Sequence, residues 1–240
     1  MRYFLLLLIC TNTMAAVSYE EYRFLETVMQ KAFLELRPSE DHFLEVNKPP
    51  APSMKDYWWN IDNVHASYSG YEDEGKRFHH IFLFGGFVRM PDMTLDSLAI
   101  TACHELGHGI GGAPFKQSGS SMEGQSDYYA TKECLKVVYK YIPQKFSIEE
   151  MALVIDPAAK ELCDNQSDDL NHCYRAMIAL ESDISFYRYL GEEVSFSQRA
   201  QEVATELNDE NTFYPSAQCR FDTSINGLLE KERPACWYIK

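Results

Sequence analysis

The chain has 240 residues and a formal net charge of −14 at pH 7. This length suits one large or two small domains, and no linker-like stretch or internal repeat divides it. The negative charge argues against nucleic acid or anionic lipid as a partner, because both repel an acidic surface. It fits an exported protein that stays in solution, and it does not require a basic substrate.

The first residues have the three-part pattern of an export signal. Met1-Arg2 is a short positive start, residues 3–10 are an apolar run too short to span a bilayer, and residues 11–16 are small or polar. We expect cleavage after Ala15 or Ala16. Residues 1–16 are therefore predicted to be a signal peptide.

Residues 17–240 are then expected to form a single mature domain, exported to the periplasm or outside the cell. No later segment is apolar for long enough to predict a transmembrane helix. A lipid anchor on Cys10 is an alternative. It is disfavoured because Ile9 is larger than the small residue usual before a lipidated cysteine.

A first helix is predicted over residues 19–37. Ser18 and Glu21 have the spacing of a capping box, an apolar stripe follows at helical spacing, and Pro38 ends the pattern. Its predicted role is structural packing.

Two strands are predicted next, over residues 57–68 and 78–89, after a proline-rich connector. Residues 69–76 between them are acidic, contain glycine and predict a turn. An exposed strand edge could bind an extended substrate, and the alternative is an ordinary hairpin that covers the core. His79 and His80 alternate faces, so they cannot both point at one metal ion, and surface or packing roles are predicted.

The central motif is His104-Glu105-Leu106-Gly107-His108, the H-E-x-x-H pattern of zinc enzymes. A helix is predicted around it, because Thr94 can cap its start and an apolar stripe falls opposite the histidines. Histidines at i and i+4 share one face, so both can reach one cation, and Glu105 projects beside them. Catalytic zinc takes three protein ligands and leaves one open position, so a third ligand must come from elsewhere.

A second helix, predicted over residues 122–141, offers two carboxylates on one face. Glu123 is the predicted third ligand, although it could simply favour the helix dipole. Asp127 is predicted to accept the outer N–H of a ligating histidine. The reverse assignment, with Asp127 as ligand, is the alternative, since spacing alone allows either to face the histidines.

H-E-x-x-H followed by E-x-x-x-D resembles the gluzincins, the thermolysin-like zinc metallopeptidases. The resemblance implies that His104, His108 and Glu123 bind one zinc ion, that Glu105 is the general base, and that Asp127 holds a histidine. A wider block, including Gly111-Gly-Ala-Pro114, looks like a group of exported bacterial proteins regarded as metallopeptidases. Pro114 stands where metzincins have their third histidine, so that branch is not indicated.

The cysteines indicate an oxidising compartment. Without Cys10, an even number remains, and sequence proximity pairs Cys163 with Cys173 and Cys219 with Cys236. Cys103 and Cys134 are left to join the two helices that carry the motif. A metal site that includes Cys103 is the rival, but adjacent helical residues point about 100° apart.

Three later helices are predicted, over residues 147–155, 172–190 and 196–207. His172 is the one later histidine that could assist catalysis. Arg220 could bind a substrate carboxylate or an oxyanion, but a structural salt bridge is the favoured prediction.

These features together predict an α+β, zincin-like fold, with a small mixed or antiparallel sheet beside an active-site helix and further C-terminal helices. The predicted function is that of a monomeric zinc metallopeptidase acting on a peptide or protein. A cell-wall amide hydrolase would use the same site. The non-enzymatic alternative is a disulfide-stapled binding protein with structural zinc, which would be expected to have four protein ligands.

Overall fold

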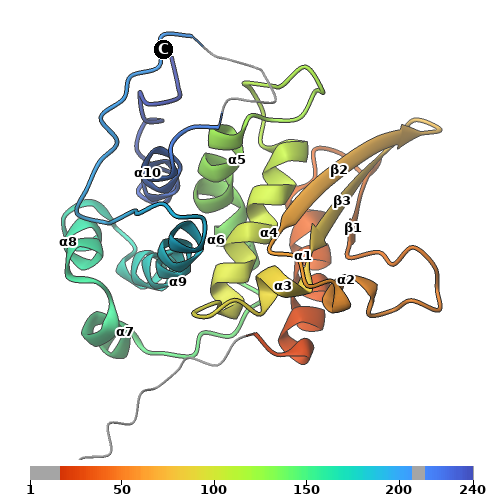
Figure 1. Ribbon diagram of the computed structural model, residues 1–240, viewed down its shortest axis with the longest axis horizontal. Coiled ribbons are helices and arrows are strands. Elements are labelled where there is room, and N and C mark those ends of the chain that lie inside the picture. Colours follow the sequence, from red (N-terminus) through yellow and green to blue (C-terminus); the bar gives the residue numbers. More distant parts are fainter. Residues whose placement is uncertain (1–16, 207–213, 240) are drawn as a thin grey trace, which may run out of the picture.

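The computed structural model describes residues 17–206 and 214–239, so the predicted signal peptide lies outside the described residues. A small sheet lies on one side of a central helix, α4, and several helices lie on the other side (Figure 1). The elements in chain order are α1 (Tyr19–Leu36), β1 (His42–Val46), α2 (Tyr57–Asn60), β2 (Ala66–Asp73), β3 (Lys76–Leu83), α3 (Gly85–Val88), α4 (Leu95–Ile110), α5 (Glu123–Tyr129), the π-helical turn η1 (Ala130–Cys134), α6 (Leu135–Val138), α7 (Ile148–Val154), α8 (Pro157–Gln166), α9 (Leu170–Tyr189) and α10 (Ala217–Leu228).

The sheet is three-stranded and mixed, in the order β1-β3-β2. β1 runs parallel to β3, and β2 runs antiparallel to it. The hairpin between β2 and β3 turns at Glu74 and Gly75, whose φ angles of 47° and 76° suit the right-handed twist of the strands. The predicted α+β class with a small mixed sheet is confirmed, and β2 is an edge strand of this sheet.

The predicted strand boundaries were partly wrong. Residues 57–60 form the helix α2, and the strand β2 begins only at Ala66 and continues through most of the predicted turn. Trp59 packs its ring against Tyr19 and Tyr22 of α1, so tertiary contacts outweigh the β propensity of this aromatic run. The second predicted strand ends at Leu83, and α3 takes up its last residues.

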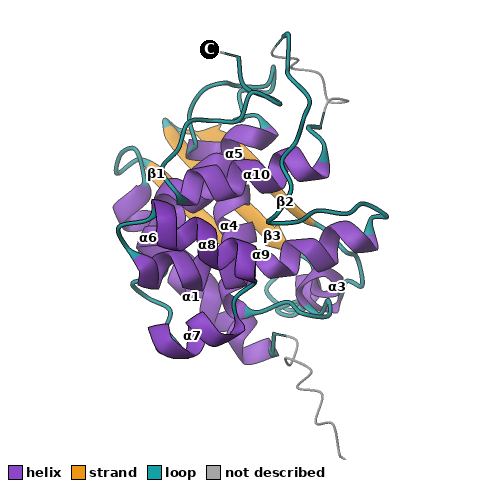
Figure 2. Ribbon diagram, turned by 90° about the vertical axis from the view of Figure 1, so that its left-hand side faces the viewer, coloured by secondary structure: helices purple, strands orange, loops and turns teal. Residues whose placement is uncertain are grey.

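The helix α4 forms as predicted and lies at the centre of the molecule. The Thr94 side chain accepts a hydrogen bond from the Ser97 backbone N–H at 3.1 Å, and the helix ends before Gly112, whose φ is +84°. α4 contacts β2 and β3 on one side and α5 and α9 on the other. Figure 2, viewed from the helical side, shows the sheet behind these helices.

The predicted second helix exists as α5, η1 and α6 in succession, and its regular part ends at Val138, before the predicted Tyr141. α5 crosses α4 at very short range. A Cβ added to Gly107 would lie 2.9 Å from the Cα of Ser126, so only glycine permits this approach. Gly107, one of the two unspecified residues of the H-E-x-x-H motif, therefore allows the second helix to lie close to α4.

Three disulfides join Cys103 to Cys134, Cys163 to Cys173, and Cys219 to Cys236, as predicted. The first ties α4 to η1 and so links the two helices of the motif.

The C-terminal part was predicted less well. α7 and α9 lie near their predicted positions, but α8 and α10 were not predicted. The predicted helix over residues 196–207 was wrong for its described part. This segment is irregular, because the ring of Phe196 packs against Phe221 and the N–H of Ala200 donates to Asp222 at 2.7 Å. Within residues 17–206 and 214–239, none of the helices is long and apolar enough to cross a membrane.

Candidate metal centre

Three of the predicted residues converge between α4 and the start of α5. One ligand atom from each of His104, His108 and Glu123 lies within 4.8 Å of the other two. The Glu123 carboxylate oxygens lie 3.5 Å from Nε2 of His104 and 3.6 Å from Nε2 of His108. Both imidazoles thus face one carboxylate across a small gap.

The outer nitrogen of each ring is engaged, and this fixes the tautomer. Nδ1 of His108 lies 2.9 Å from the backbone carbonyl of Ser121, which can only accept, so Nδ1 carries the proton. Nδ1 of His104 lies 2.7 Å from the Asp127 carboxylate, which in its ionised form also only accepts. In the neutral form of either ring, the lone pair is on Nε2, the nitrogen that faces Glu123.

Asp127 is in turn held by Arg220. The Nε and Nη2 atoms of Arg220 each donate to a different Asp127 oxygen at 2.9 Å. This bidentate pair fixes the orientation of the carboxylate toward His104. The favoured prediction of a structural salt bridge for Arg220 is therefore confirmed.

Glu123 is buried and lies between two cations. Lys116 approaches one carboxylate oxygen at 2.7 Å, and Arg220 approaches the other at 3.4 Å. Burial would raise the pKa of Glu123, but its interaction with His104 and the charge of Arg220 hold that pKa far below its usual range. The carboxylate is therefore ionised and available to a cation.

The two histidines have opposite electrostatic surroundings. Burial alone would lower the pKa of His104, but the Asp127 and Glu123 carboxylates outweigh it and raise the pKa to about 10. Burial, aided by the charge of His104, lowers the pKa of His108 to about 4. Without a metal ion, His104 thus carries a second proton, on Nε2, which a bound cation would displace.

Glu105 lies beside the cluster without belonging to it. Its side chain is 6% exposed and forms no hydrogen bond or ion pair with the other described residues. Burial raises its pKa to about 7, and the charge of Glu123 adds to the rise. A carboxyl group with a pKa near neutrality is suited to accept and return a proton.

The donor set fits a zinc ion. Two imidazole nitrogens and one carboxylate oxygen are the ligand types of catalytic zinc sites, and the outer nitrogen of each ring already faces a protein acceptor. Among the described residues, no further histidine, cysteine, aspartate or glutamate joins the group. Three ligands leave room in a tetrahedral shell for one small molecule.

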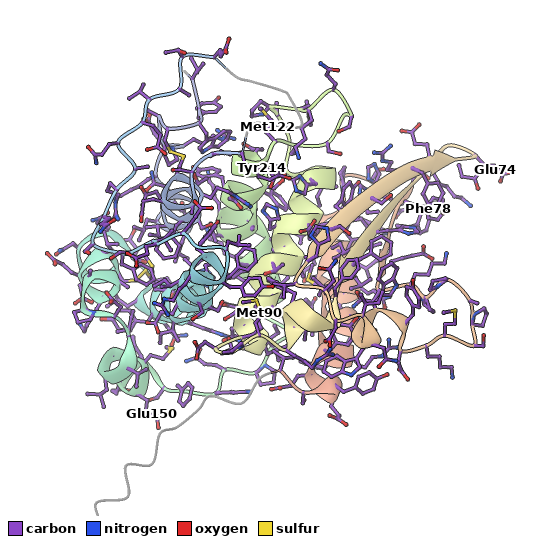
Figure 3. The ribbon with its side chains drawn as sticks, in the orientation of Figure 1. Glu74, Phe78, Met90, Met122, Glu150 and Tyr214 are labelled. Carbon is purple, nitrogen blue, oxygen red and sulfur yellow. A yellow bond between two sulfur atoms is a disulfide. The ribbon has the colours of Figure 1, made fainter. Side chains whose placement is uncertain are left out.

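The cluster opens into a cavity of about 450 Å³. Its wall combines the edge strand β2 and the residues just before it, the cluster itself, the loop after α4, and parts of α9 and α10. Tyr214, labelled in Figure 3, also lines this cavity. The charge of Glu123 raises the pKa of the Tyr214 phenol, as does partial burial.

His172 lies elsewhere. It packs against the ring of Tyr139 at 5.6 Å and does not line the cavity. His79 and His80 are packing and surface residues, as predicted. His79 is fully buried under the sheet, and His80 pairs with Glu45 at 2.7 Å.

Among the charged residues that line the cavity, Lys116 and Asp183 were not singled out from the sequence, and Tyr187 was expected only as a core residue. Lys116 lies in a glycine- and serine-rich loop, where a lone lysine carries no signal. Asp183 and Tyr187 share one face of α9 at i and i+4. That spacing was visible, but nothing in the sequence placed this face at the motif.

Comparison of the chain with protein-family models, with curated proteins and with solved structures gave no match.

Proposed function

We propose that the chain is a zinc-dependent hydrolase, most closely a peptidase of the gluzincin type. The observation that carries the proposal is the convergence of His104, His108 and Glu123 on one point, with the unpaired carboxyl group of Glu105 beside them. The resemblance of H-E-x-x-H followed by E-x-x-x-D to the gluzincins supports the same assignment.

In this proposal His104 and His108 bind zinc through Nε2 and Glu123 binds it through a carboxylate oxygen. Zinc, when bound, polarises the substrate carbonyl and lowers the pKa of water to about 7. Lys116 must share or release its oxygen of Glu123 when the ion binds, because it lies 2.7 Å from that oxygen. Asp127 keeps the proton on Nδ1 of His104, and Arg220 keeps Asp127 ionised and oriented.

Glu105 is proposed as the general base. Its carboxylate accepts the proton of the attacking water and then gives it to the leaving nitrogen. In the metal-free protein, burial raises the pKa of Glu105 to about 7. The positive charge of bound zinc favours the carboxylate form, which is the form that accepts the proton. Burial also keeps bulk water from the transferred proton.

The edge strand favours a peptide over a small amide. β2 has one partner, β3, and residues from Val64 to Tyr68 line the cavity. An extended main chain can form hydrogen bonds with such an edge and so bring its peptide bond to the cluster. On this basis we also propose the zincin-like interpretation of the fold, in which a sheet edge and the motif helix flank the substrate.

The ligand count favours catalysis over structural zinc. A structural site would be expected to use four protein ligands, and the described residues provide three. Hydrolysis of a cell-wall amide would use the same groups, and it differs from the proposal in substrate alone.

Export is proposed for the same protein. Three disulfides are stable in an oxidising compartment, and the N-terminal pattern of residues 1–16 is typical of a signal peptide.

The proposal is tested by Glu105→Gln in zinc-loaded mature protein. The variant should retain one zinc ion per chain and lose on the order of 10²-fold or more of peptide hydrolysis, since it lacks the general base. Glu26→Gln is the matched control, because Glu26 is equally buried, at 7% exposed, and lies on α1. Near-normal turnover by Glu105→Gln, or equal losses in both variants, would contradict the assignment.

A further inference from the structure

One part of the cavity extends past the metal centre along α4. Ile100 lies one turn before His104 on the same helix, so this part begins about 6 Å from the histidine along the axis. It lies on the side of His104 opposite to His108 and the Lys116 loop. Its wall comes from α3, α4 and α9, through Phe87, Ile100, Asp183, Phe186 and Tyr187. We call these five residues the inner recess.

The apolar wall of the inner recess is well ordered by its own contacts. The rings of Phe87 and Phe186 pack edge to face at 5.5 Å. α9 is fixed to α4 by the Ser97 hydroxyl, which donates to the Ala179 carbonyl at 2.8 Å. These contacts join the parts of the wall that come from α3, α4 and α9.

Asp183 is the one acidic residue among the five. Its side chain is partly exposed, lines the cavity and makes no hydrogen bond or ion pair with the other described residues. Burial raises the pKa of Asp183 to about 7, and the charge of Asp127 adds to the rise. A carboxylate in such a wall is costly unless a cation or a hydrogen-bond donor meets it.

The protein's own cations near this wall are already engaged. Nε and Nη2 of Arg220 both donate hydrogen bonds to Asp127, and Arg220 also approaches Glu123. Lys116 pairs with Glu123 at the other end of the cavity. The charges of Arg220 and His104 act on Asp183 without forming an ion pair with it, so its carboxyl group is open to a cationic group that enters the cavity.

We propose that the inner recess binds a lysine or arginine side chain of the substrate, so that the enzyme acts on peptides with a basic residue next to the cleaved bond. The aliphatic stem lies between Phe87, Ile100 and Phe186, and the cationic end pairs with Asp183. Long basic side chains bury their stems against apolar surface in this way. This inference rests on the proposed function, of which it names the substrate class.

Other side chains fit the recess less well. An apolar side chain of the same length would leave Asp183 covered and unpaired. An acidic side chain would meet a like charge in the recess. The overall charge of −14 also attracts cationic peptides at long range.

The test measures binding separately from hydrolysis. Zinc-loaded Glu105→Gln protein is titrated with N-acetyl-arginine amide and with N-acetyl-norleucine amide, which has an apolar side chain. We expect at least about 10-fold tighter binding of the arginine probe, a factor that corresponds to about 1.4 kcal/mol. Asp183→Asn added to this protein should reduce the ratio to within about 3-fold, and Asp183→Glu should restore most of it. Glu181→Gln is the control, since Glu181 is also on α9 but does not line the cavity.

A second arm compares cleavage of peptides that carry arginine, norleucine or glutamate beside the scissile bond, using the unaltered Glu105. The arginine peptide should have the highest kcat/KM, and Asp183→Asn should lower kcat/KM for that peptide while leaving the norleucine peptide within about 3-fold. Equal binding of the two amide probes overturns the inner recess, whether or not peptides are cleaved. Arginine-selective, Asp183-dependent binding without hydrolysis of any peptide supports the recess and overturns the proposed function.

Discussion

Two pairs of histidines lie close to Gly109. His104 and His108 are on α4, and His42 and His79 are paired across the parallel strands β1 and β3. A Cβ on Gly109 would come within 2.4 Å of Nδ1 of His79, so His79 packs directly against α4 next to His108. Only the first pair forms a candidate metal site.

The difference lies in what each ring nitrogen faces. In the sheet, Nε2 of His79 bonds to Nδ1 of His42 at 2.9 Å, and Nδ1 of His79 bonds to the Tyr68 hydroxyl at 2.9 Å. No nitrogen of His79 is left for a ligand. On α4 the outer nitrogens are held by an acceptor, and both Nε2 atoms face a carboxylate at the wall of a cavity.

The acid–base properties distinguish only His104 of the α4 pair from His79. Burial lowers the pKa of His79 to about 4, whereas neighbouring carboxylates raise the pKa of His104 to about 10 against the effect of burial. Burial lowers the pKa of His108 to about 4, as it does for His79, so a shifted histidine pKa does not by itself identify a metal site. Sequence spacing shows which histidines share a face, but not which ones have acidic neighbours.

The largest expected effect comes from removing the carboxylate that distinguishes the pairs. Glu123→Ala should abolish stoichiometric zinc binding, because two imidazoles alone hold the ion weakly. His79→Gln should retain one zinc ion per chain. Equilibrium titration with zinc and metal analysis of both variants will check this. Loss of zinc from the His79 variant alone would mean that the metal site lies at the sheet pair and not at His104 and His108.

The helix that carries His104 and His108 is tied to η1 by the Cys103–Cys134 disulfide. His42 and His79 are held by hydrogen bonds and packing. Replacing Cys103 and Cys134 by alanine opens a bridge that spans 31 residues. This should lower the free energy of unfolding by about 4 kcal/mol, by the loop-entropy relation. The same change at Cys163 and Cys173, which are 10 residues apart, should cost about 3 kcal/mol.

Denaturant unfolding of oxidised protein measures both values. A larger loss for the shorter loop would contradict the loop-entropy ranking of the two bridges. The unaltered mature protein should show no free thiol before reduction.

Acidification should affect the sheet pair next. The unfolded chain binds a proton on His79 near pH 6.5, and the folded protein does so only near pH 4. Stability contributed by neutral His79 is therefore lost as the pH falls from 6.5 to 4, by about 3 kcal/mol. His79→Gln should show a correspondingly flatter fall in unfolding free energy over this window. Parallel curves for the two proteins would exclude His79 as the titrating group.

The smallest effect concerns the acceptor of His104. Asp127→Ala should weaken zinc binding by roughly 10–100-fold without abolishing it, the usual cost of losing a carboxylate that orients a ligating histidine. Asp127→Asn is the control for side-chain size. If Asp127→Ala removes zinc entirely while Glu123→Ala retains it, the two carboxylates must exchange roles.

The sequence was informative where local signals determine structure. Thr94, the apolar stripe and the glycines predicted α4, because capping and periodicity act within a few residues. The spacing of Glu123 and Asp127 predicted one shared face, and the structure places both carboxylates beside His104. The disulfide pairs followed from proximity along the chain.

The sequence was uninformative where distant packing determines structure. β1 is short and pairs in parallel with β3, which periodicity within the strand does not reveal. The aromatic run at Tyr57–Asn60 favours a strand by propensity but forms a helix beneath α1. Asp156 and Pro157 are good start signals for α8. The residues that follow are mostly polar, so the apolar periodicity of this helix is hard to recognise in the sequence.

The environment of the site was likewise beyond the sequence. Lys116, which precedes Glu123 in the sequence, and Arg220, which lies far after it, both approach the Glu123 carboxylate. Asp183 lines the cavity from α9. These contacts depend on how four helices and a loop pack, so no local motif encodes them.

The most direct test of the account is the location of zinc in crystals of the mature protein, from anomalous diffraction at the zinc edge. We predict one ion per chain, bound to Nε2 of His104, Nε2 of His108 and a carboxylate oxygen of Glu123, with its remaining position open to the cavity. A fourth protein ligand, or an ion bound away from Glu123, would contradict the assignment of a catalytic zinc site.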